Sequence, residues 1–241
     1  MKRCLVKASR FVCLLAVLVF GALGLAQAAE PAKGGAIPAV DLKVLDGLDR
    51  ALGSDKAPVT IFEYASLTCS HCADFQKTIF PQIKAAYIDS GKLRWVLRDY
   101  PLDGVALKAA VIARCVEPNY FYSLIDLLFE NQKQWVMDRD PQVAAMRYAR
   151  LSGLSDDKLK SCNQGDQVTN QILAKRQSAE AVYKVQSTPS FVLNDQLIVG
   201  ARDFTTFKAA IDQALDKAGV PASKPAEKAA AKPAGDDAPK K

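Results

Sequence analysis

The sequence feature that most constrains this chain is the motif Cys69-Ser70-His71-Cys72, which lies between a strand pattern and a helix pattern. The run Val59–Phe62 is apolar and β-branched, which predicts a buried strand. After the motif, apolar residues recur at helical steps up to Pro81. Cys69 is therefore expected at the first turn of a helix, where free N–H groups and the helix dipole stabilise a thiolate. This arrangement of strand, paired cysteines and helix indicates redox chemistry.

The net charge of +6 is concentrated at the two ends of the 241-residue chain. The first 28 residues hold four basic and no acidic side chains, and from Lys217 onward six lysines oppose three acids. The body between these ends is almost neutral, so the basic total does not indicate nucleic-acid binding. The length suits one domain of ordinary size or two small ones.

Residues 1–28 have the three parts of a secretory signal peptide. A basic start is followed by the apolar run Phe11–Leu25, and Ala26-Gln27-Ala28 fits the small-x-small cleavage pattern. The apolar run is shorter than the roughly 20 residues that a membrane-spanning helix needs. We therefore expect export and removal of this segment, together with Cys4 and Cys13. An uncleaved N-terminal anchor is the alternative.

Removal of the signal leaves four cysteines, an even number that suggests pairing in an oxidising compartment. If Cys69 pairs with Cys72, then Cys115 pairs with Cys162 or both remain free. A zinc site is not expected, because Cys115 and Cys162 do not form a close pair and the chain has one histidine. Haem attachment requires a histidine directly after the second cysteine, where this chain has Ala73.

The rest of the chain predicts strands on both sides of a long helical block. Residues 104–185 have helical apolar spacing, and Asp140-Pro141 and Ser155 are typical helix starts. Before this block we expect a short helix over residues 41–52 and a second strand, Leu93–Leu97. After it we expect two strands and a last helix, at Ser190–Leu193, Leu197–Val199 and from Asp203 to near Gly219.

Two motifs together resemble the DsbA-type thiol:disulfide oxidoreductases. Glu63 lies six residues before Cys69-Ser70-His71-Cys72, and Ser187-Thr188-Pro189-Ser190-Phe191 stands in the later β half. The expected order of elements matches this family over residues 51–219. The resemblance therefore implies an α/β thioredoxin-like fold, with a mixed β-sheet flanked by helices and an inserted all-helical domain.

The expected organisation has six parts, because the helical insertion divides the thioredoxin-like domain. They are a signal peptide at 1–28, an N-terminal extension at 29–50, the first part of the thioredoxin-like domain at 51–103, the helical insertion at 104–185, the second part of the domain at 186–219 and a tail rich in alanine, lysine and proline at 220–241. The tail has no periodicity, which is typical of disordered segments.

The resemblance also assigns roles to residues around the cysteines. It implies that the Thr188-Pro189 bond is cis and faces Cys69, and that Glu63 is a buried carboxylate beneath the cysteines. We expect Glu63 to accept the proton of Cys72 when that thiol attacks, because a lone buried carboxylate is costly to keep ionised. His71 is expected to donate a hydrogen bond or a positive charge to the Cys69 thiolate. A solvated Glu63 and a functionless, exposed His71 are the alternatives.

The function expected from these features is that of a periplasmic protein disulfide oxidoreductase, most simply a dithiol oxidase. The Cys69–Cys72 disulfide would carry the electrons, with no metal and no other cofactor. The expected partners are reduced, unfolded exported proteins and a DsbB-like, quinone-linked membrane protein that reoxidises the Cys69–Cys72 pair. The protein itself is expected to be a monomer. A disulfide isomerase or reductase is the runner-up, since Ser-His stands between the cysteines where the best-known oxidases have Pro-His. A non-catalytic secreted binding protein is the third possibility.

A second, structural disulfide is expected between Cys115 and Cys162. Both cysteines lie on expected helices of the insertion, in an exported chain. Neither has a histidine or another cysteine beside it, so they lack the features of a reactive pair. Two buried free thiols are the alternative, because free cysteine is among the most buried residue types.

Overall fold

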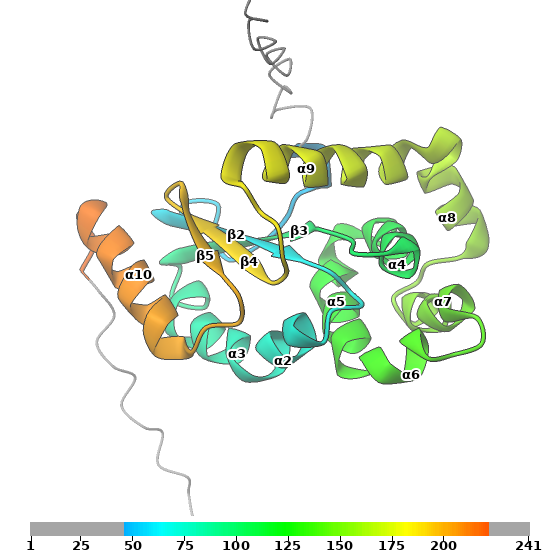
Figure 1. Cartoon of the computed structure of the whole chain (residues 1–241), viewed down its shortest axis with the longest axis horizontal. Helices are drawn as coiled ribbons and strands as arrows, with labels where there is room; N and C mark the ends of the chain where they lie inside the picture. The colour runs from blue at the N-terminus through cyan, green and yellow to red at the C-terminus, as the bar shows by residue number, and fades with distance from the viewer. Residues whose placement is uncertain (1–45, 222–241) are drawn as a thin grey trace, which may run out of the picture. The chain divides into compact units, whose positions relative to one another are not determined.

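A five-stranded mixed sheet forms the centre of the fold in the computed structural model, which describes residues 46–221 (Figure 1). The strand order across the sheet is β1-β3-β2-β4-β5. β2 and β3 run parallel, and the other neighbouring pairs run antiparallel. The strands are β1 (Arg50–Leu52), β2 (Val59–Ala65), β3 (Leu93–Asp99), β4 (Ser190–Leu193) and β5 (Gln196–Val199).

A tight turn joins β4 to β5 and fixes where the segment before β4 lies. Asn194 and Asp195 form this turn with positive φ angles of 48° and 61°. Asn and Asp adopt such left-handed conformations more readily than other non-glycine residues, so the hairpin forms without glycine. The register of β4 places Phe191 opposite Glu63 of the central strand β2. The segment that enters β4 therefore reaches the end of β2 from which the cysteine motif begins.

One face of the sheet is covered by four helical segments (Figure 1). They are α2 (Ser70–Thr78), α3 (Phe80–Ile83), the π-helical turn η2 (Lys84–Ile88) and α10 (Phe204–Lys217). α2 and α3 are separate helices, and Pro81 lies in the first turn of α3, where it needs no backbone hydrogen bond. Buried aromatic rings fill the space beneath them, with centroids 4.7 Å apart for Phe75 and Phe191 and 5.4 Å apart for Phe75 and Phe207.

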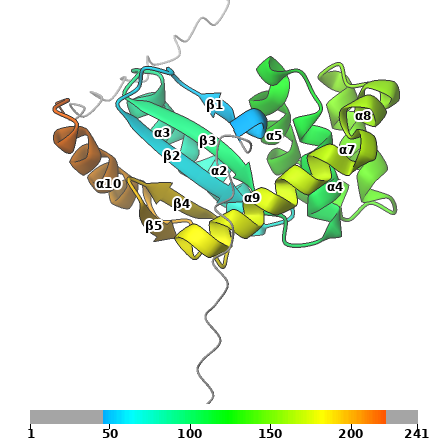
Figure 2. The same ribbon diagram turned by 90° about the horizontal axis from the view of Figure 1, so that it is seen from above.

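The helical block after β3 lies beside the sheet (Figure 2), and its core residues pack directly against the cysteine-bearing helix α2. Its core includes Cys72 and Ala73 of α2 beside Leu124 and Leu128, all 4% exposed or less. Arg114 attaches the block to the sheet, because its buried guanidinium donates to Asp99 at 2.6 Å. The block consists of α4 (Gly104–Arg114), η3 (Pro118–Tyr120), α5 (Phe121–Glu130), α6 (Gln132–Val136), α7 (Pro141–Leu151), α8 (Asp156–Cys162) and η4 (Gln164–Asp166).

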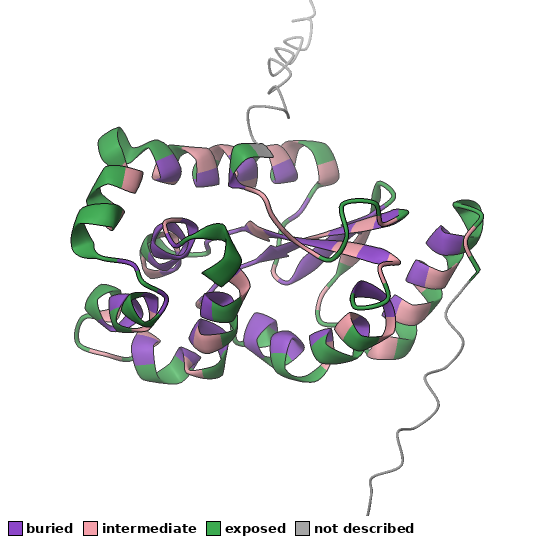
Figure 3. Ribbon diagram, turned by 180° about the vertical axis from the view of Figure 1, so that it is seen from behind, coloured by how far each residue is buried: buried purple, intermediate pink, exposed green. Residues whose placement is uncertain are grey.

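The long helix α9 (Gln167–Tyr183) packs against both the helical block and the sheet. Ala179 and the following Val185 pack on Tyr64 and Val192, on the sheet face opposite α2. Near its start, Val168 and Ile172 belong to the core of the helical block. Figure 3 shows buried positions along the inner side of this helix. The expected boundary between the helical insertion and the second part of the thioredoxin-like domain, at residue 185, thus lies just after a helix that packs against both.

The expected short helix over residues 41–52 is wrong where the structure describes that range. Residues 46–48 form a single 3₁₀ turn, η1 (Asp46–Leu48), and Arg50–Leu52 pair with β3. Asp49 between them accepts hydrogen bonds from Arg98 of β3, at 2.7 Å from Nη2, and from Lys175 of α9. These long-range contacts override the local leucine spacing.

Three expected helix starts have the expected capping side chains. Asp140, Ser155 and Asp203 each accept a hydrogen bond from a backbone N–H in the first turn, at the starts of α7, α8 and α10. Within residues 46–221, none of the helices is both long enough and apolar enough to cross a membrane. The expected signal peptide, most of the N-terminal extension and nearly all of the tail lie outside the described residues.

Candidate active site

The two cysteines of the motif lie in different environments at the start of α2. Cys69 is the N-cap of α2 and is half-buried, whereas Cys72 is fully buried. Both are free thiols in the structure. The loop before them is held by Thr68, which donates from Oγ1 to Asp103 at 2.8 Å, and by a hydrogen bond from the backbone N–H of Cys69 to Ser66. An incoming thiol can therefore reach Cys69 but not Cys72.

The loop before β4 comes into contact with Cys69. The peptide bond between Thr188 and Pro189 is cis, and the Cys69 thiol donates to the carbonyl oxygen of Thr188 at 3.4 Å. The two residues are 119 positions apart in the chain. They meet because β4 pairs with β2, whose end leads into the cysteine motif.

Hydrogen bonds stabilise the Cys69 thiolate. They lower its pKa from 9.0 to about 5, and the largest contribution comes from the Cys72 thiol. The backbone N–H groups of Cys72 and His71 lower the pKa further, while burial opposes them. For Cys72 the shift is reversed, because burial raises the pKa of this thiol strongly and sharing a proton with Cys69 adds to the rise. Cys69 is thus the ionised sulfur and Cys72 the protonated one.

A buried carboxyl group, Glu63, lies beneath the cysteines on β2. Its side chain is fully buried, and Trp95 on β3 donates from Nε1 to its Oε2 at 3.1 Å. Burial raises the pKa of Glu63 from 4.5 to about 8. When Glu63 is ionised, its negative charge in turn raises the pKa of Cys72, so the protonation of the carboxyl group and that of the thiol are coupled.

Comparison with known proteins gives consistent matches over this part of the chain. The family model described as Thioredoxin matches residues 46–213. A Rickettsia conorii protein named "Putative protein-disulfide oxidoreductase" is 32% identical over 191 residues, which cover 78% of this chain and 69% of that protein. The crystal structure of α-DsbA1 from Wolbachia pipientis has a TM-score of 0.64 and 30% identity, and the match covers 70% of this chain and 92% of that one.

The chain belongs to the DsbA-type thiol:disulfide oxidoreductases. Matches to four further Rickettsia proteins span 62% to 66% of those proteins' lengths. Disulfide bond formation protein D of Bacillus subtilis is 26% identical over 68% of this chain and 76% of its own length. The crystal structure of oxidised BdbD from the same organism, with a TM-score of 0.59 and 23% identity, shares the fold. The thioredoxin-like fold with a mixed sheet, expected from the sequence, is confirmed.

In this DsbA-type protein, His71 approaches Cys69 through its backbone. The N–H of His71 is among the groups that lower the pKa of Cys69, whereas the imidazole is exposed on the first turn of α2. The expected donation of a hydrogen bond or charge from the imidazole therefore stays a prediction.

Gln132 is a site residue that sequence reasoning missed. This α6 side chain is 8% exposed, and its Nε2 donates to the carbonyl oxygens of Leu67 at 2.8 Å and Cys69 at 2.9 Å. The helical block thereby holds the cysteine loop directly. No signal in the sequence distinguishes Gln132, because it stands in the polar run Glu130–Gln134 and its partner lies 63 residues away.

The second cysteine pair lies in the helical block. Cys115, the C-cap of α4, is joined by a disulfide to Cys162, the last residue of α8, with the Cα atoms 5.7 Å apart. The other arrangement considered, two free thiols, is absent at these positions. The bridge lies apart from the Cys69–Cys72 motif, and both of its sulfurs border the core of the block.

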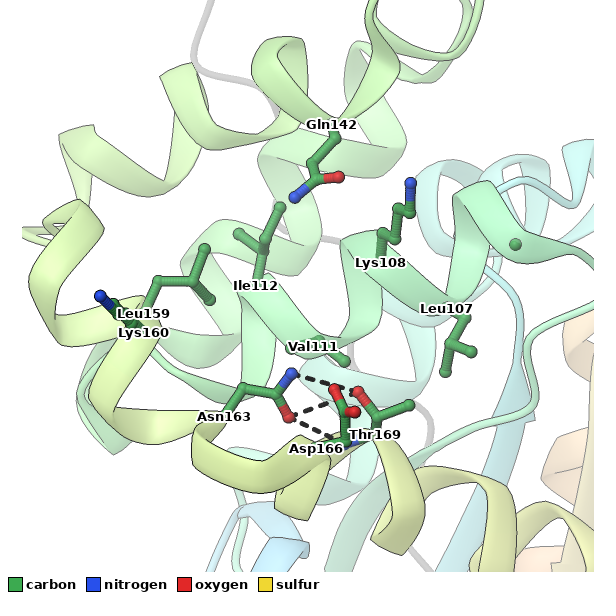
Figure 4. A pocket seen from close by; sticks show the side chains of 11 residues that line it. Leu107, Lys108, Val111, Ile112, Gln142, Leu159, Lys160, Asn163, Asp166 and Thr169 are labelled. Atoms are coloured by element: carbon green, nitrogen blue, oxygen red, sulfur yellow. Dashed lines mark hydrogen bonds between the residues drawn. The ribbon is translucent and has the colours of Figure 1, made fainter.

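A pocket of about 490 Å³ opens beside this disulfide, between α4, α7, α8 and the start of α9 (Figure 4). Leu107, Val111 and Leu159 form apolar walls, and Asn163 accepts hydrogen bonds from Thr169 at the pocket edge. None of the lining residues comes from the cysteine motif or the Thr188–Pro189 loop. Among the residues that the structure describes, no cluster of three or more histidine, cysteine or acidic side chains is arranged to hold a metal ion.

Proposed function

We propose that this protein is a periplasmic dithiol oxidase that introduces disulfides into exported proteins. The observation that carries the proposal is the contrast between its two cysteines. The pKa of Cys69 is lowered to about 5, and burial raises the pKa of Cys72. A stable Cys69 thiolate favours the reduced protein over its disulfide form. A protein that favours its own reduced state is a strong oxidant of substrate thiols.

The proposed oxidation proceeds by two thiol–disulfide exchanges. A substrate thiolate attacks Sγ of Cys69 in the oxidised protein, and the Cys69–Cys72 bond breaks with its electron pair on Cys72. Cys72 takes a proton from Glu63, because the pKa of the buried thiol lies above that of the carboxyl group. A second substrate thiolate then attacks the substrate sulfur of the mixed disulfide. Cys69 leaves as a thiolate, and two electrons have passed from the substrate to the protein.

Reoxidation reverses these roles. The Cys69 thiolate attacks a disulfide of a partner, and the first partner sulfur leaves as a thiolate. Cys72 gives its proton to Glu63 and then attacks Sγ of Cys69, which restores the Cys69–Cys72 bond and releases the second partner thiolate with the electron pair. The proposed partner is a DsbB-like, quinone-linked membrane protein. In this proposal the oxidase acts as a monomer. The half-exposed position of Cys69 supports access by a macromolecule. The proposed export rests on the signal-like residues 1–28.

The loop formed by Thr188 and Pro189 is proposed to hold the substrate chain next to Cys69. The carbonyl oxygen of Thr188 accepts from the Cys69 thiol at 3.4 Å in the reduced protein. In the oxidised protein, which receives the substrate, Cys69 is part of the disulfide and has no S–H, so this carbonyl oxygen can accept from a substrate backbone N–H. The contact between Cys69 and Thr188 thus supports a place for the substrate chain beside the reacting sulfur.

The reduction potential of the Cys69–Cys72 pair tests the direction of the reaction. The purified protein is equilibrated with mixtures of glutathione and glutathione disulfide, and its reduced fraction is measured by acid quenching and alkylation. An oxidase is expected to give a value of about −120 mV, as for DsbA, rather than about −270 mV, as for thioredoxin. A value below about −220 mV would contradict the proposal and favour a reductase.

A further inference from the structure

Two buried oxygen atoms next to Cys72 have no hydrogen-bond partner in the described part of the protein. They are Oε1 of Glu63 and Oε1 of Gln76, in side chains that are 0% and 7% exposed. Buried polar atoms are usually satisfied by protein groups or by ordered water. Gln76 follows Cys72 by one helical turn on α2, so both residues lie on the same side of that helix, which faces the core.

Gln76 links this buried place to the protein surface. Its Nε2 donates to Oδ1 of Asp126 on α5 at 2.8 Å. Gln76 and Asp126 both line a pocket of about 260 Å³ between α2, α3 and α5. Asp126 is exposed to solvent in this pocket, whereas Gln76 is buried. The charge of Asp126 reaches Glu63 and contributes to the raised pKa of that buried carboxyl.

The chemistry of Glu63 requires such a link. With a pKa of about 8, Glu63 holds a proton in most molecules at pH 7. It can accept the proton of Cys72 only after losing its own proton to solvent. After giving a proton to Cys72 in the other half-reaction, it must regain one. Glu63 is fully buried, so each exchange needs polar groups that connect it to water.

We propose that Gln76 and Asp126 form the proton route of Glu63, with water between the two carboxyl groups that is held in place by the free Oε1 of Gln76. The proton of Glu63 passes along this water to Asp126 and from there to solvent, and it returns by the same path, while the Gln76 amide keeps its own protons. One proton enters or leaves in each half-reaction, and no electrons move along the route. The inference rests on the proposed role of Glu63 in the function above, and it assigns Gln76 as a positioning residue and Asp126 as the exchange site.

The charges around both carboxyl groups are compatible with this route. Withdrawal from water raises the pKa of Asp126, and the neighbouring Glu130 adds to the rise, while Gln76 and Lys84 oppose it. Lys77 also lines the pocket. The raised pKa of Asp126 lets this carboxyl group take up a proton more readily than an ordinary aspartate does.

The groups that interact with Glu63 through a hydrogen bond or through charge come from three elements. They are Cys72 on α2, Trp95 on β3, and Tyr122 and Asp126 on α5. Of these groups, Asp126 also lines the pocket between α2, α3 and α5 and is exposed.

The test measures the attack of Cys72 on the mixed disulfide, which is the step that needs an ionised Glu63. Reduced protein is mixed with excess glutathione disulfide between pH 5.5 and 9, quenched with acid and analysed by mass spectrometry. Decay of the glutathione adduct at Cys69 gives the rate. Asp126→Asn should lower the maximum of the pH–rate profile by about tenfold and enlarge the solvent deuterium isotope effect. Gln76→Leu, which removes the bridging amide, should do the same.

Glu130→Gln is the matched control, because Glu130 lines the same pocket one turn later on α5 without contacting Gln76 in the structure. Because Glu130 acts on Asp126 through its charge alone, this variant should shift the profile along the pH axis and leave its maximum unchanged. A purely electrostatic role of Asp126 would move the Asp126→Asn profile along the pH axis with the same maximum, and this result would overturn the route. Glu63→Gln separates the proposed proton route from the proposed role of Glu63 as the proton acceptor of Cys72. If it slows the step while Asp126→Asn and Gln76→Leu do not, the route is wrong and the role of Glu63 stands; if it has no effect, that role is wrong as well.

Discussion

Gln132 on α6 holds the carbonyl oxygen of Cys69 at 2.9 Å from its Nε2 atom. The same nitrogen donates to Leu67 at 2.8 Å, so one buried amide fixes two carbonyl groups of the loop that enters α2. The helical block therefore does more than cover the sheet. It sets the backbone position of Cys69 at the start of α2.

Replacing Gln132 by leucine should leave both carbonyl groups buried without a donor. The expected loss of unfolding free energy is roughly 1–3 kcal/mol, and the loop should become more mobile. Urea unfolding of the oxidised protein measures the first effect, and hydrogen exchange at residues 67–70 measures the second. Gln134→Ala, on the exposed side of the same helix, is the control and should change neither quantity. Equal stability of Gln132→Leu and wild type would show that the two hydrogen bonds contribute little.

The lowered pKa of Cys69 should make the stability of the reduced protein depend on pH. The unfolded thiol has a pKa of about 8.5, so the favourable contribution of the thiolate is complete above that value. It is lost as the pH falls through the folded pKa of about 5. We expect reduction to raise the melting temperature at pH 7, and the advantage to shrink towards pH 4.5. Thiolate absorbance near 240 nm, with Cys69→Ser as the blank, gives the pKa directly. A titration near pH 8.5 would contradict the proposed oxidase.

Glu63 should destabilise the fold at neutral pH. Its folded pKa of about 8 lies above the ordinary value of 4.5, so stability falls as the pH rises between these two values. Glu63→Gln keeps an acceptor for Trp95 and removes the charge. It should raise the unfolding free energy at pH 7 by about 3 kcal/mol and by almost nothing at pH 4. Denaturant unfolding of both reduced proteins across this range checks the difference. A constant difference at all pH values would argue against a titrating buried carboxyl group.

The two active-site cysteines should have separate tasks in variants. Cys69→Ser should abolish the oxidation of a dithiol peptide, because Cys72 is fully buried and cannot be reached. Cys72→Ser should retain Cys69 as an attacking thiol and accumulate mixed disulfides, because the resolving thiol is gone. Non-reducing gels and mass spectrometry of cell extracts identify these adducts. Adducts that form in Cys69→Ser and are missing in Cys72→Ser would reverse the assignment.

Removing the Cys115–Cys162 bridge should weaken the helical block and spare the chemistry. The bridge closes a loop with a sequence separation of 47, and the double alanine variant should lose about 2–4 kcal/mol of stability. The reduction potential of the Cys69–Cys72 pair should stay unchanged. Mass spectrometry of non-reduced peptides from exported protein checks the bridge itself. Complete loss of dithiol oxidation in a folded double variant would contradict a purely structural role.

The sequence by itself was sufficient for the features that depend on neighbouring residues. Cys69 lies at a helix start because an apolar strand, a short loop and a helical pattern follow one another within twenty-odd positions. The caps at Asp140, Ser155 and Asp203 act on N–H groups three residues ahead. Such interactions lie within one turn of helix, so the sequence pattern predicts them without knowledge of the rest of the fold.

The tertiary structure alone decided which distant groups meet. It turned residues 50–52 into an edge strand, oriented the imidazole of His71 outward, and brought Gln132 to Cys69 and Asp126 to Gln76. Each of these outcomes depends on how α5, α6 and α9 pack against the sheet and α2. The packing is selected by the summed burial of apolar side chains, and that sum does not depend on which polar side chain ends up opposite another. Partners that lie 50 to 126 positions apart are therefore invisible to local periodicity, although they hold the catalytic loop in place.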